Sequence, residues 1–171
     1  QENWEDRFGW QMAVDRERLN LSRQSNIIRE ETALMNEAGS NQRFLIEEQD
    51  KTSAGLTELD LAKHDFVNCL IGNETSITGE VKLARLKESK VIRYGATVFM
   101  GLWVDYQALK KESVLEKLYQ SKGITYLDFF GDVLLNPSGH RCVLYLYRYG
   151  DGVWRWSCLW NFGRARRWYC H

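Results

Sequence analysis

Two segments of alternating side chains near the end of the chain constrain its fold more than any other feature. Residues 140–149 read His-Arg-Cys-Val-Leu-Tyr-Leu-Tyr-Arg-Tyr, and residues 153–161 read Val-Trp-Arg-Trp-Ser-Cys-Leu-Trp-Asn. Alternation of this kind is typical of β-strands. Gly150-Asp151-Gly152 lies between them, and Asp-Gly is a preferred pair in two-residue hairpin turns because both central residues take positive φ. The sequence therefore predicts an aromatic-rich antiparallel hairpin.

The length of this turn decides which side chains share a face. A two-residue turn at Asp151-Gly152 pairs Tyr147 with Trp156 and segregates the large aromatic residues from the leucines and arginines. A three-residue Gly-Asp-Gly turn would instead place the tryptophans with the leucines. The two-residue turn is favoured for its segregation, and it puts Cys142 and Cys158 on opposite faces. Its aromatic face holds Tyr145, Tyr147, Tyr149, Trp154, Trp156 and Trp160.

Helical patterns are concentrated before the hairpin. Val14, Leu21, Ile28 and Met35 repeat at intervals of seven, which predicts an amphipathic helix that ends at Gly39. Apolar residues at helical spacing predict a second helix, capped by Thr52 or Ser53 and ending at Gly72, and a third over Gln107–Ser121 that Gly123 ends.

Extended segments are predicted in the second half of the chain. Lys90–Tyr94 and Ala96–Tyr106 are rich in β-branched and aromatic residues and predict two strands joined at Gly95. Ile124–Leu135 predicts another strand, followed by a turn at Asn136–Gly139. The segment Ser76–Leu86 is ambiguous and fits a strand as well as anything.

This order of elements predicts a single α+β domain over residues 1–171, with N-terminal helices packed on a curved, mostly antiparallel, cone-like sheet. Residues 1–50 are predicted to form an amphipathic helical segment. Its seven-residue period leaves a second interpretation open, in which the segment is an extension or an arm for dimerisation.

Composition excludes several classes of protein. A hydrophobic share of 44% and an aromatic share of 13% are values of globular proteins. No segment approaches the roughly 20 apolar residues of a membrane span, and no signal peptide is visible. We therefore expect a cytoplasmic protein without a membrane partner, although the start at Gln1 leaves a removed leader open. The four cysteines form no Cys-x-x-Cys pair and the three histidines are scattered, so neither a metal nor a cofactor is expected.

The charges are distributed unevenly along the chain. Residues 1–75 hold 15 acidic and 8 basic residues, whereas residues 76–171 hold 8 acidic and 15 basic residues. Such asymmetry suggests an anionic partner for the basic half. The alternative is that the two halves complement each other within the fold or within an oligomer.

Two segments within residues 90–161 resemble the later strands of the nuclear transport factor two-like superfamily. They are Lys90–Tyr106, with Gly95 between its strands, and Tyr149–Trp160, which contains Asp151-Gly152-Val153-Trp154. That superfamily comprises cone-shaped α+β domains and includes SnoaL-type cyclases, dehydratases and isomerases. The resemblance implies helices first and a curved antiparallel sheet around a pocket. The long insert Gln107–Gly139, an extra strand after Asn161 and a longer first helix depart from it, and no catalytic residue can be carried over.

We expect a small-molecule binding domain, with a pocket lined by aromatic residues that takes a small apolar or aromatic molecule. Whether it is also an enzyme, of cyclase, dehydratase or isomerase type, is open. His140 and Asp105 are the candidates for acid–base catalysis. The competing interpretation is that the aromatic residues fill a core. The candidate ligand-binding residues are Trp103, Tyr145, Tyr147, Trp154, Trp156 and Trp160.

Two further functions stay open. Arg164, Arg166 and Arg167 lie beside Trp168 and Tyr169, and arginines among aromatic residues can grip phosphates and stack on bases. This pattern predicts a nucleic-acid or polyanion-binding module as the first alternative. The second is an assembly protein that forms homodimers through its N-terminal helix.

Overall fold

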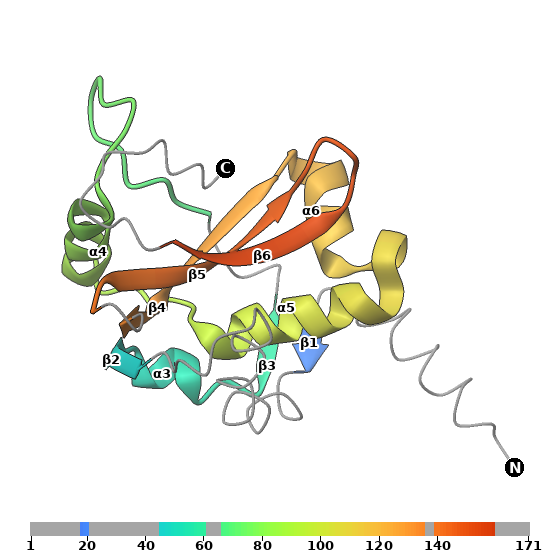
Figure 1. Ribbon diagram of the computed structural model, residues 1–171, viewed down its shortest axis with the longest axis horizontal. Coiled ribbons are helices and arrows are strands. Elements are labelled where there is room, and N and C mark those ends of the chain that lie inside the picture. The colour runs from blue at the N-terminus through green and yellow to red at the C-terminus, as the bar shows by residue number, and fades with distance from the viewer. Residues whose placement is uncertain (1–17, 21–44, 61–65, 136–138, 160–171) are drawn as a thin grey trace, which may run out of the picture.

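The computed structural model describes residues 18–20, 45–60, 66–135 and 139–159. It shows an α+β protein whose helices pack on a four-stranded antiparallel sheet, and within the described residues this sheet is not closed (Figure 1). The predicted α+β class is confirmed. In spatial order the sheet contains β2 (Leu45–Gln49), β4 (Tyr126–Leu135), β5 (Arg141–Arg148) and β6 (Trp154–Leu159).

The remaining elements precede β4 in the chain. Two short strands, β1 (Arg18–Asn20) and β3 (Glu58–Asp60), pair with each other in a separate antiparallel sheet. The helices come before the three long strands. They are α3 (Lys51–Ala54), α4 (Gly79–Glu88), α5 (Ala96–Leu109), the 3₁₀ helix η3 (Lys110–Glu112) and α6 (Val114–Lys122).

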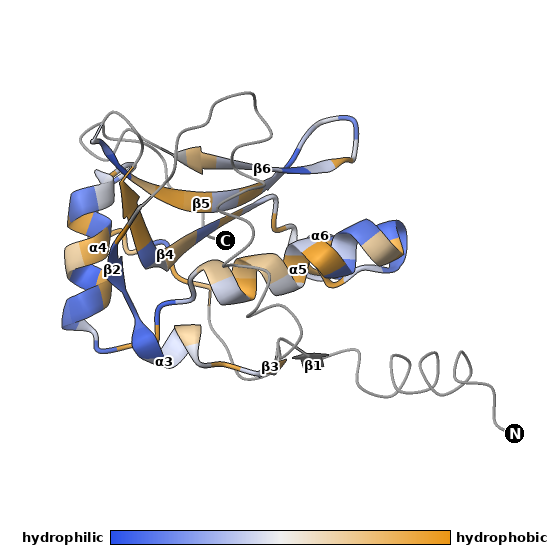
Figure 2. Ribbon diagram, turned by 60° about the horizontal axis from the view of Figure 1, so that its bottom comes forward, coloured by the Kyte–Doolittle hydropathy of each residue, from blue (hydrophilic) through white to orange (hydrophobic). Residues whose placement is uncertain are grey.

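The sheet buries apolar side chains on both faces. On β5, Leu144 and Leu146 belong to the core that α5 and α6 cover, whereas Val143, which precedes Leu144, belongs to a smaller core beneath α4. This alternation is the period of two expected of a strand. Figure 2 shows α5 as hydrophobic along most of its length, while α4 alternates between hydrophilic and hydrophobic positions. The larger core therefore lies between the sheet and the pair α5 and α6.

Helix α5 corrects the prediction of a strand over Ala96–Tyr106. Its side chains are buried in nearly every direction, including those of Val98, Phe99 and Leu102. A helix that is buried on most sides has a continuous apolar sequence without a 3.6-residue pattern, so periodicity cannot separate it from a buried strand. Lys90–Tyr94, also predicted to be a strand, forms no regular helix or strand.

The beginning of α5 is fixed on β4 by backbone and carboxylate contacts. The Gly131 N–H donates to the Tyr94 carbonyl (2.8 Å), and the Gly131 carbonyl accepts from the Asp50 N–H (2.6 Å). The buried Asp132 carboxylate accepts from the Ala96 N–H (2.5 Å) and from the Gln49 side-chain amide (2.8 Å). Asp132 therefore occupies the site where the first free N–H groups of the helix need an acceptor.

The ends of α4 and α6 follow from local sequence. The Thr78 hydroxyl accepts from the Val81 N–H (3.2 Å) and begins α4, so the ambiguous segment Ser76–Leu86 is largely helical. Ser113 caps α6 in the same way. Gly123 ends α6 in a left-handed conformation with φ of 68°, which confirms the predicted stop.

The predicted second helix, from Thr52 or Ser53 to Gly72, is wrong. Helix α3 stops after Ala54, and its cap is Asp50, whose carboxylate accepts from the Thr52 and Ser53 N–H groups (3.0 and 3.1 Å). The chain then enters β3, which pairs with β1. This distant pairing outweighs the local helical spacing.

Strand β1 contradicts the first predicted helix at three of its positions, 18–20. The remainder of that helix lies outside the described residues. So do most of the predicted turn at 136–139 and the residues that follow Leu159.

The hairpin between β5 and β6 has a three-residue turn, so the favoured register is wrong and its competitor is right. Tyr147 pairs with Arg155, and Leu146 pairs with Trp156. The Tyr149 N–H donates to the Val153 carbonyl (3.0 Å), and Gly152 takes a φ of 80°. A left-handed glycine at the third position is the usual geometry of such a turn. The tryptophans therefore share a face with the leucines.

Replacing Gly131 tests how closely α5 is docked. A Cβ at this position would overlap the Arg93 carbonyl and the Gly95 amide nitrogen, which are backbone atoms and cannot move aside cheaply. We expect Gly131→Ala to lower the free energy of unfolding by about 3 kcal/mol or more. Gly150→Ala is the control, because its Cβ meets nothing within 4 Å. Urea denaturation measures both, and equal midpoints would contradict the tight docking.

Candidate functional site

Three tyrosines form a cluster on the sheet face that α4 covers only in part. They are Tyr126 on β4 and Tyr145 and Tyr147 on β5. Their ring centroids are 5.3 to 6.5 Å apart and their ring planes differ by 11° to 27°. Tyr126 is 40% exposed, and the other two are half-buried. We call this cluster the tyrosine face.

Strand register brings the tyrosine face together. Tyr126 pairs with Tyr147 across β4 and β5, and Tyr147 pairs with Arg155 across β5 and β6. Asp128, Tyr145 and Ser157 form the next row along the sheet. Since side chains two residues apart on a strand share a face, both rows project to the side of the sheet on which α4 lies.

One border of the tyrosine face is a buried ion pair between α4 and β4. Lys82 Nζ lies 3.4 Å from Asp128 Oδ2, and the two side chains are only 2% and 3% exposed. The Lys82 ammonium also lies 5.2 Å from the centre of the Phe130 ring. The apolar stem of Lys82 thus belongs to the core while its charge is matched by a carboxylate, as a buried charge requires.

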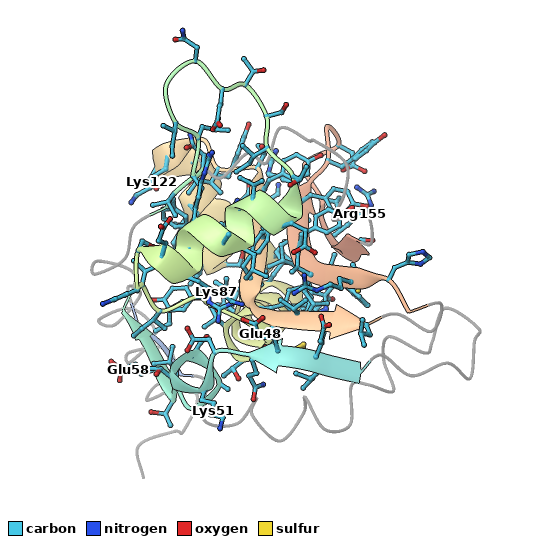
Figure 3. All side chains as sticks on the ribbon, turned by 90° about the vertical axis from the view of Figure 1, so that its left-hand side faces the viewer. Glu48, Lys51, Glu58, Lys87, Lys122 and Arg155 are labelled. Carbon is cyan, nitrogen blue, oxygen red and sulfur yellow. The ribbon has the colours of Figure 1, made fainter. Side chains whose placement is uncertain are left out.

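Arg155 forms the other border, at the tip of the hairpin. Its guanidinium donates to the Asp151 carboxylate at 3.2 and 2.6 Å and lies 5.0 Å from the centre of the Tyr149 ring. Its side chain is 41% exposed. Figure 3 shows Arg155 and Lys122 on opposite sides of the molecule in that view. Each of the two cations that border the tyrosine face is paired with a carboxylate, Lys82 with Asp128 and Arg155 with Asp151.

The tryptophans predicted to line the same pocket lie on the opposite side of the sheet. Trp154 is 1% exposed, and its indole N–H donates to Glu116 (3.2 Å). Trp156 is half-buried with its ring 5.9 Å from that of Phe99. Trp103 is half-buried on α5 and packs against the larger core. The aromatic set is thus divided between core and surface. Trp160, Arg164, Arg166 and Arg167 lie outside the described residues.

A charged contact fixes the hairpin to α6 on the tryptophan side. The Arg148 guanidinium donates two hydrogen bonds to the Glu116 carboxylate (3.0 and 2.9 Å) and stacks 3.7 Å from the centre of the Tyr119 ring. The hydrogen bond from Arg148 holds the pKa of Glu116 below its usual value. The two hydrogen bonds between Arg148 and Glu116 orient the hairpin on the larger core.

The two candidates for acid–base catalysis lie apart from the tyrosine face. Asp105 is buried on α5, on the other side of the sheet, and its Oδ2 accepts from the Val114 N–H (2.7 Å). Burial raises the pKa of this carboxyl. His140 is exposed and immediately precedes β5, at the end of that strand away from Tyr147. Asp105 is therefore placed to fix the beginning of α6.

Cys142 and Cys158 share a face, contrary to the prediction from the two-residue turn. A hydrogen bond with Cys142 and burial raise the pKa of the Cys158 thiol. Within the described ranges, no group of three histidine, cysteine or acidic side chains is arranged to hold a metal ion.

No protein-family model, no curated protein and no solved structure matches this chain. In the part of the chain that the structure describes, no helix is both long enough and apolar enough to cross a membrane.

Sequence reasoning missed four residues of this site: Tyr126, Asp128, Lys82 and Arg155. The alternation Tyr126-Leu127-Asp128 within a predicted strand is a signal that could have placed the first two on one face. Lys82 carried no such signal, because its segment was ambiguous. Arg155 required the correct turn length.

Breaking the buried pair should destabilise the fold strongly. We expect Lys82→Met to lower the free energy of unfolding by about 3 to 5 kcal/mol, because it leaves Asp128 charged and buried. The double variant Lys82→Met/Asp128→Leu should recover most of this loss. Lys87→Met is the control, since Lys87 is 46% exposed and pairs with Glu48 at the surface (Figure 3). Lys87→Met should lower the free energy of unfolding by less than about 1 kcal/mol.

Urea denaturation of these variants distinguishes the explanations. A double variant as unstable as Lys82→Met would show that the loss comes from packing and not from an unpaired charge.

Asp105 should stabilise the fold through the oxygen that accepts the hydrogen bond from the Val114 N–H. Asp105→Ala removes the acceptor of a buried N–H and should cost about 1 to 3 kcal/mol, whereas Asp105→Asn keeps an oxygen there and should cost less. Because the folded pKa is raised, the wild-type protein should lose stability as the pH rises from about 4 through that pKa. Asp105→Asn should lack this loss in urea denaturation at several pH values, and an unchanged pH profile would contradict the assignment.

Proposed function

We propose that this chain is a binding domain for a small, flat, aromatic molecule that stacks on the tyrosine face. The common orientation of the three rings, whose planes differ by 11° to 27°, carries the proposal. Rings that are nearly parallel at these distances are stacked with an offset, so a planar ligand can continue the stack on an exposed ring face. Stacking of an aromatic base on such a side chain contributes about 1 to 3 kcal/mol per contact. The partial exposure of Tyr126 leaves room for it.

The local charge favours a small ligand over a polyanion. Lys82 and Arg155, at the borders of the tyrosine face, are each paired with a carboxylate. A surface that binds polyanions instead needs several unpaired cations to replace released counterions. The polyanion alternative rests on Arg164, Arg166 and Arg167, and retention on heparin at raised salt would favour it. The homodimer alternative rests on the N-terminal segment, and the mass in solution would decide it.

The resemblance to the cone-shaped superfamily concerns the hairpin and not the segment before it. Residues 149–159 include the hairpin turn and β6, but Lys90–Tyr106 contains most of helix α5 and carries no resemblance in strand pattern. We propose binding without catalysis, because Asp105 has a structural role and Asp128 pairs with Lys82. A cytoplasmic location belongs to the same proposal.

Removing one ring from the tyrosine face should reduce the stabilisation by ligand. In a thermal-shift screen of planar aromatic compounds, we expect hits that raise the melting temperature of the wild-type protein. Tyr147→Ala should reduce that shift by more than half. Tyr119→Ala is the matched control, since Tyr119 is half-buried on α6 and packs against the larger core on the other side of the sheet. An absence of hits in a broad library would argue against the proposal, as would equal effects of both substitutions.

A further inference from the structure

We infer that the ligand of the tyrosine face carries one anionic group, which Arg155 binds, so that a nucleoside monophosphate is the class of molecule that fits. This inference rests on the proposed function and adds to it the polar half of the ligand. The base would stack on the tyrosines, and the phosphate would lie at the hairpin edge.

The placement of Arg155 beside Tyr147 is the first argument. The two residues are direct partners across β5 and β6, so their Cβ atoms lie about 5 Å apart on one face. A ribose spans a similar separation between its base and its 5′-phosphate. Ser157, in the next row, adds a hydroxyl on the same face.

The chemistry of the guanidinium is the second argument. Arg155 is held by Asp151 through Nη1 and Nη2 and by the ring of Tyr149. Within the described residues its Nε–H has no acceptor, and 41% of the side chain is exposed. A planar group fixed in this way loses little freedom on binding, and its fork geometry suits phosphate oxygens.

Asp151 limits the charge that the site accepts. Its carboxylate beside Arg155 repels further anions, so one phosphate at the edge is tolerated better than a chain of phosphates. This is why we commit to a mononucleotide and not to a nucleic-acid strand.

The experiment compares AMP with adenosine by isothermal titration of the full chain. We expect AMP to bind the wild-type protein roughly tenfold tighter than adenosine, since a hydrogen bond to a charged group has about this effect. Raised salt should weaken AMP binding and leave adenosine binding nearly unchanged. Arg155→Gln should reduce the affinity for AMP to that for adenosine, and Tyr147→Ala should abolish the binding of both.

Arg141→Gln is the matched control, because Arg141 lies at the far end of β5 and pairs with Glu47 and Glu80. Circular dichroism would establish that each variant folds. Equal affinities of the wild-type protein for AMP and adenosine would overturn the role of Arg155 but keep the proposed function. Binding of neither would overturn both. Much tighter binding of an oligonucleotide would overturn the commitment to a mononucleotide.

Discussion

The hydrogen bond from the Ala96 N–H to the buried Asp132 carboxylate is the contact on which the rest of the structure depends. It joins the beginning of α5 to the middle of β4, although the two residues are 36 positions apart in the chain. Burial raises the pKa of Asp132, and hydrogen bonds from Ala96 and Gln49 oppose that rise. The neighbouring Gly131 lets the backbone before α5 touch the strand. Once α5 is docked, its apolar side chains pack against those of the sheet and complete the larger core.

Strands β4, β5 and β6 and the end of α6 could be predicted because their signals are local. Alternation marks a half-buried strand, and Gly123 suits the left-handed end of a helix. Helix α5 could not be recognised, since its acceptor at Asp132 belongs to a distant segment and its own sequence is apolar along most of its length. The prediction of a longer helix in place of α3 failed for a related reason, because the β3 strand that follows α3 depends on pairing with β1.

The candidate site illustrates how a one-residue error in register propagates. The tyrosines were rightly expected to share a face, but the tryptophans were assigned to it on the strength of a turn that local sequence left open. In the structure Trp154 anchors the core through Glu116, while Tyr147 stands beside Arg155. The division gives each aromatic type its usual role. Indole fills the interior, and phenol keeps its polar end near water.

The turn at Gly150–Gly152 also restricts how this hairpin can change over evolutionary time. Since side chains alternate strictly, gaining or losing a single codon in the turn would exchange the two sides of β6, exposing Trp154 and burying Arg155. A side chain at Gly150 would meet nothing within 4 Å and is tolerable, but a change in length is tolerable only in steps of two. Homologous chains that preserve this architecture should therefore keep an odd number of residues between Tyr149 and Val153.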